Sequence, residues 1–442
     1  MDIVNTLSLN SNPKIEISFD GGELSSDSGL FLMKEFLYQI GFMDILVECF
    51  STKDIATYRI HSDIENLLQS MYQIFAGYFE DDRSDSLTNE PVFTACLGKD
   101  ALASQPTMSR FFNRLDEATL EQFNEIMRRL RKVIYSIEGR PNAMLFDLDT
   151  TLLNTYGSQE GAAWNFHYED TGYHPQMCFN GLNGDLIRIQ LRKGTQYCST
   201  DVTEFMEPIF HEFTVDYPYT NLLVRCDSGY ATPELYEQCE RYGAQYAIRL
   251  KANANLYKLA TDIEKELDDK TQEDMISYAV VYGEFMYKAA SWKKERRVAC
   301  KIEKPANSME HRFTFIVTTI TASSEFVVGF YCKRGQMENF IKECKNDFDF
   351  ASTSSKSMIV NDNRVQIHGL VYNVVNAMRR LVFPKHLLKA RMETIRINLV
   401  KIASRIIRHG RKIRYRLCSS CPYKDEFRHI MDNIHGLQAS YL

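Results

Sequence analysis

The sequence AMLFDLDTTLL occupies residues 143–153 and places two aspartates and two adjacent threonines in an apolar run. Apolar and β-branched residues in a run of this length favour a β-strand that is buried on at least one face. Because side chains alternate along a strand, Asp147 and Asp149 point to the same side. Alternation does not decide which of the two carboxylates is functional. The stretch therefore predicts a buried strand that carries two carboxylates on one side.

A second strand is predicted from the sequence NLLVRC, which begins at Asn221. It ends at Asp227, and a Ser-Gly turn follows. Thr232 and Pro233 then have the residue types of a helix N-cap and first helical position. Open α/β sheets bind ligands at the carboxyl ends of their strands. Asp227 is therefore a second candidate for a functional carboxylate.

A third acidic residue lies in the sequence YCKRGQME, which begins at Tyr331. The preceding apolar run FVVGF, residues 326–330, predicts a strand, and the residues after Tyr331 predict a helix. Arg334, Glu338 and Lys345 are separated by four and then seven residues, so they share one face of that helix. A carboxylate between two cations suits a metal-binding carboxylate beside a phosphate chain.

These observations place three candidate carboxylates in distant parts of the chain: Asp149, Asp227 and Glu338. Hard divalent cations take oxygen ligands and favour substrate phosphates. Two such ions about 4 Å apart activate the nucleophile and stabilise the leaving oxygen in phosphodiester cleavage. Since every proposed ligand atom is oxygen, we expect two Mg²⁺ ions, for which Mn²⁺ can substitute.

The Tyr-(2)-Arg-(3)-Glu-(6)-Lys spacing, the Asp-x-Asp-Thr-Thr strand and the Arg-Cys-Asp-Ser-Gly-Tyr turn resemble DDE transposases of bacterial insertion sequences. Three further runs are similar to one branch, the insertion-sequence thirteen-eighty family: YGSQEGAA at 156–163, GYHP at 172–175 and ASQPTMSR at 103–110. The resemblance extends from about Asp20 into the C-terminal region. It implies that Asp149, directly before the threonine pair, is the catalytic aspartate. This chain has Thr-Thr where the family more commonly has Ser-Thr.

The resemblance implies a transposase that binds the terminal inverted repeats of its element and cuts and joins DNA there. Asp149, Asp227 and Glu338 are then both catalytic residues and metal ligands, with Asp149 bridging the two ions. The partners implied are double-stranded DNA of the element ends and of the target. Because two ends must be held together, a homodimer is expected in the synaptic complex.

Five residues are predicted to contact DNA. Arg334 is expected to bind the DNA backbone through its forked guanidinium group, and Lys345 is expected to bind it as a point charge. Tyr331 hydrogen-bonds a phosphate or stacks on a displaced base. Trp292, beside several cations, fits stacking on an unpaired base, but it fits a packed core equally well. Arg110 lies on a helix that follows a Gln-Pro-Thr breaker and cap, typical of a recognition helix or of an ordinary capped helix in a bundle.

Composition predicts a packed globular protein, since 44% of the 442 residues are hydrophobic and 25% are charged. The N-terminus has no signal-peptide pattern, and no apolar run is long enough to span a membrane. Eleven scattered cysteines fit a reducing compartment. We therefore expect a cytoplasmic protein that has no membrane partner, and the resemblance implies that it is bacterial and nucleoid-associated.

The distribution of charge indicates a polyanionic partner even though the net charge is −6. Residues 379–416 contain thirteen Lys or Arg residues and a single acid, Glu393. Such a block is an electrostatic footprint for phosphates. A solvated helical face is the other interpretation, and the near absence of acids favours contact with a polyanion.

The order of predicted elements is that of an α/β, ribonuclease H-like catalytic core with an inserted β-rich domain and helical N- and C-terminal regions. Three antiparallel strands are followed by helix, strand, helix and strand: 147–153, 176–180, 186–191, 201–213, 221–226, 233–242 and 245–250. The predicted domains are an N-terminal, mostly helical DNA-binding region, the first part of the core, the inserted β-rich domain, the last part of the core with the Glu338 helix, and a basic helical C-terminal region. Their bounds are 1–138, 139–268, 269–330, 331–378 and 379–442.

Two alternative functions are weighed against this one. The Asp-x-Asp-x-Thr-Leu sequence also resembles the first motif of haloacid-dehalogenase-like phosphatases, with Asp147 as nucleophile and Asp149 as acid and base. No later paired-aspartate motif accompanies it, and it leaves the Tyr331–Lys345 signature unexplained. The second alternative is a non-catalytic DNA-binding relative, which the presence of all three carboxylates disfavours.

Overall fold

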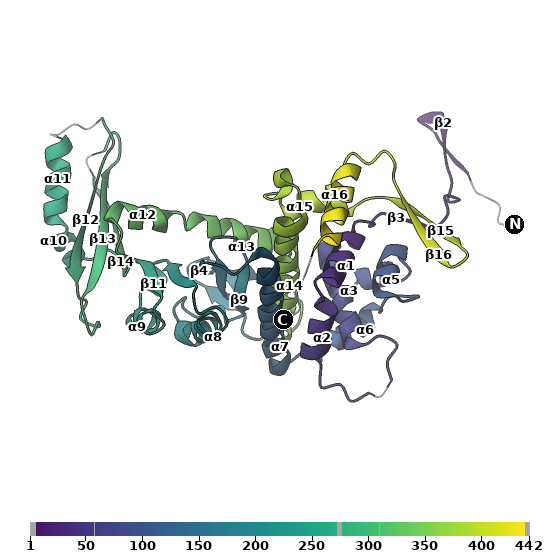
Figure 1. The fold of residues 1–442 in the computed structure, drawn as a ribbon, viewed down its shortest axis with the longest axis horizontal. Helices are drawn as coiled ribbons and strands as arrows, with labels where there is room; N and C mark the ends of the chain where they lie inside the picture. Colours follow the sequence, from purple (N-terminus) through teal and green to yellow (C-terminus); the bar gives the residue numbers. More distant parts are fainter. Residues whose placement is uncertain (1–5, 57, 272–275, 309, 438–442) are drawn as a thin grey trace. The chain divides into compact units, whose positions relative to one another are not determined.

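The computed structural model describes residues 6–56, 58–271, 276–308 and 310–437. The chain forms two compact units (Figure 1). Unit 1 comprises Met1–Glu138, Asn346–Ser352 and Asn363–Leu442, and unit 2 comprises Gly139–Lys345 and Thr353–Asp362. No helix in the described ranges is long and apolar enough to cross a membrane. The bounds of the five predicted domains stay predictions, and residues 272–275 and 309 of the predicted insert lie outside the described ranges.

An eight-stranded mixed sheet organises unit 2, which is a mixed α/β structure (Figure 1). Its strand order is β12-β13-β14-β11-β10-β4-β8-β9. β10 pairs in parallel with both β4 and β11, and the other neighbours are antiparallel. The strands are β4 (Ala143–Thr150), β8 (Gln176–Asn180), β9 (Leu186–Gln190), β10 (Asn221–Cys226), β11 (Gln245–Leu250), β12 (Ala279–Tyr287), β13 (Arg296–Lys304) and β14 (Arg312–Thr318). The predicted order of three antiparallel strands, then helix, strand, helix and strand is confirmed.

The helices of unit 2 connect or cover these strands. α9 begins as its sequence predicts, since the Thr232 side chain accepts a hydrogen bond from Leu235 N and Pro233 is the first residue. A small sheet of order β5-β7-β6 follows β4. The remaining elements are β5 (Leu153–Asn154), β6 (Ala163–Asn165), β7 (Asp170–Tyr173), α8 (Val202–Val215), the 3₁₀ turn Ser228–Tyr230, α9 (Pro233–Arg241), α10 (Ala254–Leu259), α11 (Thr261–Thr271), α12 (Ser324–Cys332) and α13 (Gly335–Asp347).

One prediction for the inserted region is wrong. Residues 326–330 form part of helix α12 and not a strand. The Ser323 side chain caps this helix by accepting from Phe326 N, and Val327, Val328 and Tyr331 bury one helical face. The predicted β-rich runs before it form β12, β13 and β14. β14 pairs antiparallel with β11, so these three strands extend the central sheet.

Helices make up most of unit 1. α3 has the residue pattern of a capping box, in which Ser62 and Glu65 each bond the other's backbone N–H. An exposed hairpin, β1 (Leu7–Leu9) with β2 (Asn12–Ile17), precedes the helices. The helices are α1 (Leu30–Gln39), α2 (Phe42–Cys49), α3 (Asp63–Ala76), α4 (Arg83–Ser86), α5 (Pro91–Leu97), α6 (Gln105–Phe112), α7 (Glu117–Glu138), α14 (Met358–Val382, in unit 1 from Asn363 on), the turn Lys385–Leu387, α15 (Met392–Ile395), the π-turn Arg396–Val400 and α16 (Lys424–His435).

The prediction that the basic C-terminal region is helical is wrong for residues 404–417. Strands β15 (Ser404–His409) and β16 (Lys412–Leu417) form a hairpin, and β15 pairs with β3 (Leu24–Ser25). Along β16, Ile413, Tyr415 and Leu417 alternate with Lys412, Arg414 and Arg416, which is the two-residue period of a strand. Gly410 has a φ of +60° and so supplies the left-handed residue that the tight connection requires.

Candidate functional site

The two aspartates of β4 have different environments. Asp147 lies opposite Arg225 in the parallel pairing of β4 with β10. Both side chains are buried, and Arg225 donates from Nε to Oδ1 at 2.7 Å and from a terminal nitrogen to Oδ2 at 2.6 Å. Both oxygens of Asp147 are therefore bound by one guanidinium. This arrangement leaves Asp149 as the aspartate of β4 that faces the candidate site.

Asp149 forms an ion pair with Arg334 at 2.8 Å. Burial raises the pKa of Asp149, and the charge of Asp227 raises it further, while Arg334 acts in the opposite direction. Burial lowers the pKa of Arg334, but the charges of the two aspartates outweigh this and the pKa lies above its ordinary value. Arg334 thus interacts electrostatically with both carboxylates, an arrangement that the sequence did not predict.

Asp227 lies beside Asp149 because of the strand register. The β4–β10 pairing ends at Leu148 opposite Cys226, so the next residues along the two strands are Asp149 and Asp227. Asp227 starts the 3₁₀ turn, and its Oδ1 accepts a hydrogen bond from Gly229 N at 2.9 Å. The structure therefore brings two of the three predicted carboxylates together at the carboxyl ends of parallel strands.

Glu338 lies in the first turn of α13, one helical turn after Arg334, and its side chain is exposed. Across the described residues, no group of three or more His, Cys, Asp or Glu side chains is arranged to hold a metal ion. The convergence of Glu338 with the aspartate pair stays a prediction.

Lys345 and Tyr331 are partly or largely covered by the fold. Lys345 donates from Nζ to the carbonyl of Leu152 at 2.7 Å, and burial lowers its pKa. This bond ties α13 to the segment that follows β4. Tyr331 packs in a core cluster with Val327 and Val328. The stacking role predicted for Tyr331 is therefore not supported by an exposed ring face.

Trp292 and Arg110 are not part of the aspartate site. Trp292 is only 5% exposed and packs edge-on against Tyr236 and Tyr287, with Arg296 over its ring. The burial of Trp292 among these neighbours favours its packed-core interpretation, and the stacking role stays a prediction. Arg110 is exposed on α6 of unit 1 and donates to Thr107 Oγ1.

Sequence reasoning missed Tyr230 and Tyr168, which are near the aspartates, and Arg192, which is near Tyr230. Tyr230 is fully buried, its hydroxyl has no hydrogen-bond partner in the described structure, and its pKa is raised by burial and by the charge of Asp149. Tyr168 donates to the carbonyl of Thr150 at 3.2 Å, and burial raises its pKa to about 12. Arg192 donates to several backbone carbonyls of the segment before α8. Only Tyr230 had a sequence signal, its place in the turn after Asp227.

The donor set can be tested against the predicted magnesium ions. Asp149 and Asp227 supply carboxylate oxygens from rigid strand ends, which is the ligand chemistry that Mg²⁺ prefers. Tyr230 and Arg334 surround the same pair with polar groups. The aspartate pair therefore fits a hard divalent cation, whereas a three-carboxylate ligand set is not assembled.

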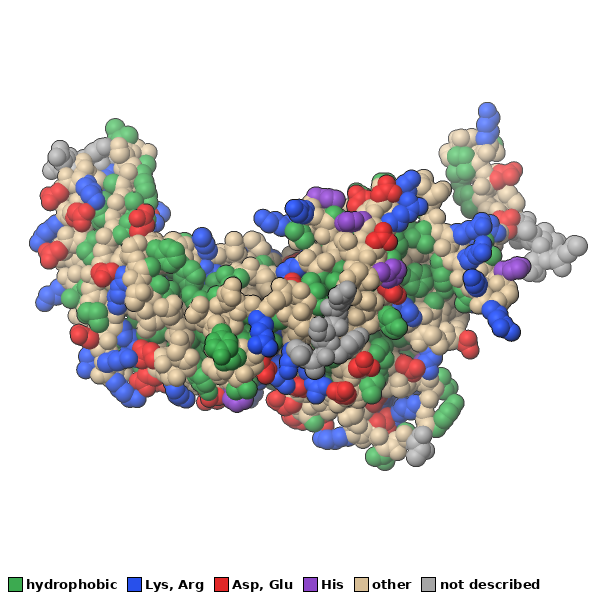
Figure 2. Space-filling model, viewed as in Figure 1, with side chains coloured by type: hydrophobic (Ala, Val, Ile, Leu, Met, Phe, Trp, Pro, Cys, Tyr) green, Lys and Arg blue, Asp and Glu red, His purple; other side chains and the backbone are tan. Residues whose placement is uncertain are grey.

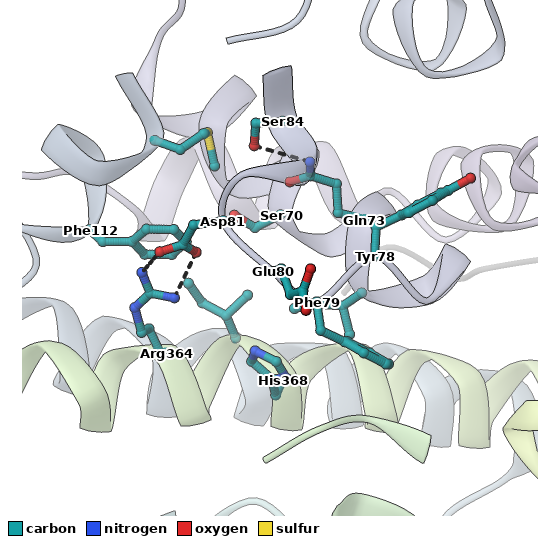
Figure 3. A pocket seen from close by; sticks show the side chains of 13 residues that line it. Ser70, Gln73, Tyr78, Phe79, Glu80, Asp81, Ser84, Phe112, Arg364 and His368 are labelled. Carbon is teal, nitrogen blue, oxygen red and sulfur yellow. Dashed lines mark hydrogen bonds and ion pairs between the residues drawn. The ribbon is translucent and has the colours of Figure 1, made fainter. Parts of the chain in front are cut away.

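Two cavities are lined by residues other than those of the aspartate pair. A cavity of about 30 Å³ in unit 1 is bordered by the ion pair of Asp81 with Arg364 and by the buried ring of His368 (Figure 3). That volume holds about one water molecule. In unit 2 a hollow of about 480 Å³ is lined by Phe213, Tyr242 and neighbouring residues. These residues precede β10 and β11, at the end of the sheet opposite to Asp227.

Comparison with known proteins places the chain in a family. A family model described as "Transposase DDE domain group 1" matches residues 7–439. No curated protein matches the sequence. Among solved structures, the piggyBac transposase synaptic complex with hairpin DNA is similar with a TM-score of 0.41 and 13% identity, covering 94% of this chain and 86% of that one.

Proposed function

Because the chain belongs to the family Transposase DDE domain group 1, we propose that it binds the terminal inverted repeats of an insertion sequence and catalyses metal-dependent strand cleavage and strand transfer at those ends. The observation that carries the proposal is the pairing of Asp149 with Asp227 beside Arg334. The order of the central strands further supports a ribonuclease H-like core. The quoted motifs support membership of the insertion-sequence thirteen-eighty branch.

Each residue of the site has a specific task in this proposal. Asp149 and Asp227 hold a divalent cation, Mg²⁺ with Mn²⁺ as a substitute, and Glu338 from α13 completes the ligand set for two ions. The metal supplies Lewis-acid activation of the attacking oxygen and stabilisation of the leaving oxygen. Arg334 binds a phosphate oxygen beside the bond that breaks, and Lys345 holds the adjoining segment in place through Leu152.

The partners and compartment follow from the same proposal. The substrates are double-stranded DNA of the element ends and of the target, held in a synaptic complex by a homodimer. Such a reaction takes place on the bacterial nucleoid in the cytoplasm. The haloacid-dehalogenase-like alternative assigns Asp147 as nucleophile, and this is disfavoured because Arg225 binds both of its oxygens.

Nicking of a plasmid that carries the gene with its flanking DNA tests the proposal. We expect cleavage to require Mg²⁺ or Mn²⁺ and to be abolished in Asp149→Asn, Asp227→Asn and Glu338→Gln. Asp262→Asn, which changes an exposed carboxylate of unit 2, serves as the control and should cleave normally. Unchanged cleavage in Asp149→Asn or Asp227→Asn would overturn the assignment of the site. If only Glu338→Gln cleaves normally, the assignment of Glu338 as the third metal ligand fails and the assignment of the two aspartates stands.

A further inference from the structure

Hairpin β15–β16 has two chemically different faces. The cross-strand pairs Arg405 with Arg416, Ile407 with Arg414 and His409 with Lys412 place these side chains on one face. We call Arg405, Lys412, Arg414 and Arg416 the cationic face; all four side chains are exposed. Neither strand contains an acidic residue. Figure 1 labels the two strands of the hairpin, and Figure 2 shows blue Lys and Arg side chains at the same position.

The opposite face of the hairpin packs onto unit 1. Ile406 is buried, and the ring of Tyr415 lies edge-on to Phe31 of α1 at 4.8 Å. The Tyr415 hydroxyl donates to the carbonyl of Pro91 at the start of α5. Arg408, also on this face, is bound by Glu23. The packed face therefore fixes the orientation of the hairpin and directs the cationic face to solvent.

Three cations in the earlier part of the basic block, Arg391, Arg396 and Lys401, are bound by other groups of unit 1. Lys401 pairs with buried Asp27, Arg391 with Asp347, and Arg396 donates to two carbonyls at the end of α3. Within the described ranges, none of the four side chains of the cationic face takes part in an ion pair. Lys401, Arg391 and Arg396 are thus bound within the fold, whereas the four cations of the cationic face are exposed and have no acidic partner among the described residues.

This arrangement is unfavourable for the isolated protein. Like charges directly opposite each other on neighbouring strands are destabilising, and Arg405 with Arg416 is such a pair. A polyanion that lies across the hairpin removes that repulsion. We propose that the cationic face of β15–β16 binds the phosphate backbone of double-stranded DNA.

The choice of DNA rests on the proposed function, since a transposase must hold duplex DNA. A two-stranded ribbon is narrow enough to enter the major groove, and arginines on it reach phosphates on either side. An anionic membrane is the other polyanionic surface to consider. Membrane-binding elements pair cations with exposed apolar side chains. Most apolar side chains of this hairpin instead lie on the packed face.

The salt dependence of DNA binding tests the inference. Binding of a fluorescein-labelled, mixed-sequence duplex is measured by anisotropy in EDTA, so that no cleavage is needed. The fourfold variant carries Arg405→Gln, Lys412→Gln, Arg414→Gln and Arg416→Gln. Each phosphate contact contributes about 0.9 to the slope of log K against log salt, so the slope should fall by about 3 to 4. Between about 50 and 200 mM salt, the wild type should lose roughly 100-fold more affinity than the variant.

A matched pair of single variants separates the cationic face from net charge. Arg414→Gln should lower the slope by about 1, whereas Arg408→Gln, on the packed face of the same hairpin, should leave it unchanged. Equal slopes for Arg414→Gln and Arg408→Gln would overturn the inference, as would a fourfold variant with the wild-type slope. Equal loss of binding to vesicles with anionic lipid and to DNA would point to a general anionic surface and would also overturn it.

Folding and the proposed function are checked separately. Thermal unfolding of the fourfold variant should match or exceed that of the wild type, because a repulsive pair is removed. If the wild type fails to cut DNA but the slope falls as expected, the hairpin inference stands and the catalytic proposal fails. If the wild type cuts DNA and the slope is unchanged, the hairpin inference alone fails.

Discussion

The ion pair between Asp147 and Arg225 is expected to be a major determinant of the stability of unit 2. Asp147 is 0% exposed and Arg225 is 1% exposed, and two hydrogen bonds join them. Removing one member of a buried pair leaves an uncompensated charge and costs about 3–5 kcal/mol. For a unit of this size, about 1 kcal/mol shifts the melting temperature by roughly 2–4 °C. We therefore expect Asp147→Leu to lower the melting temperature of unit 2 by on the order of 10 °C.

A double-mutant cycle isolates the pair from the loss of packing. Arg225→Met alone should be destabilising for the same reason as Asp147→Leu. The double variant replaces both charges with apolar side chains of similar size, which is often neutral or stabilising. Urea unfolding of the four proteins should give a double variant more stable than either single variant. Additive losses in the double variant, or single losses below about 1 kcal/mol, would refute the assignment of a strongly coupled buried pair.

Arg225 also contacts helix α12, which ends two residues before Arg334. Its second terminal nitrogen donates to the carbonyl of Phe330 at 2.6 Å, near the end of α12, four residues before Arg334. The double variant lacks this bond even where its stability is restored. Cleavage by the folded double variant should therefore be slower than wild type, with a larger effect on kcat than on overall DNA affinity. A double variant of wild-type stability and wild-type kcat would show that the bond does not position Arg334.

Three further outcomes are expected. Burial lowers the pKa of His368 to about 4, so the unfolded chain binds a proton at a higher pH than the folded protein does. The free energy of unfolding of unit 1 should therefore drop by roughly 3 kcal/mol between about pH 6.5 and 4. In pH-dependent urea unfolding His368→Gln should flatten that slope, and an unchanged slope would contradict the assignment. Gly29→Ala places a Cβ against the backbone oxygen of Leu399 and should lower the free energy of unfolding by at least about 1–3 kcal/mol. Gly329→Ala is the control, because nothing lies within 4 Å of its added Cβ, and it should be neutral or stabilising in thermal unfolding. Trp292→Ala should destabilise unit 2 by about 3–5 kcal/mol while DNA affinity of the folded protein is retained; a loss of affinity at unchanged stability would restore the stacking role.

The strands nearest the site were predictable because local signals agree there. Apolar runs bounded by turn residues predicted Gln176–Asn180, Asn221–Cys226 and Gln245–Leu250 with the bounds that the structure has. Helix α9 was predictable for the same reason, since a Thr-Pro start precedes an amphipathic stretch. Each of these segments has a pattern that is complete within its own residues.

Residues 326–330 show where such signals fail. A short apolar run fits a buried strand or a buried helix, and periodicity does not separate the two. The outcome here depends on partners distant in sequence: Val327, Val328 and Tyr331 pack on Ala247 and Ile316 of the central sheet. Hairpin β15–β16 was missed for a related reason. The thirteen cations drew attention to charge, whereas the alternation of cations with Ile413, Tyr415 and Leu417 in β16 is the pattern of a strand.

Strand register explains why two aspartates with the same alternation have different roles. The parallel partner strand β10 places Arg225 opposite Asp147. Its pairing with β4 ends at Cys226, opposite Leu148, so Asp149 lies just beyond the last paired residue. The residue at which β10 ends is Cys226, and the next one is Asp227. The register of β4 against β10 thus produces both the buried ion pair of Asp147 with Arg225 and, two residues later along each strand, the pair of Asp149 with Asp227. No pattern within either strand contains that alignment, so sequence alone left Asp147 and Asp149 open, and the resemblance to a family was needed to choose between them.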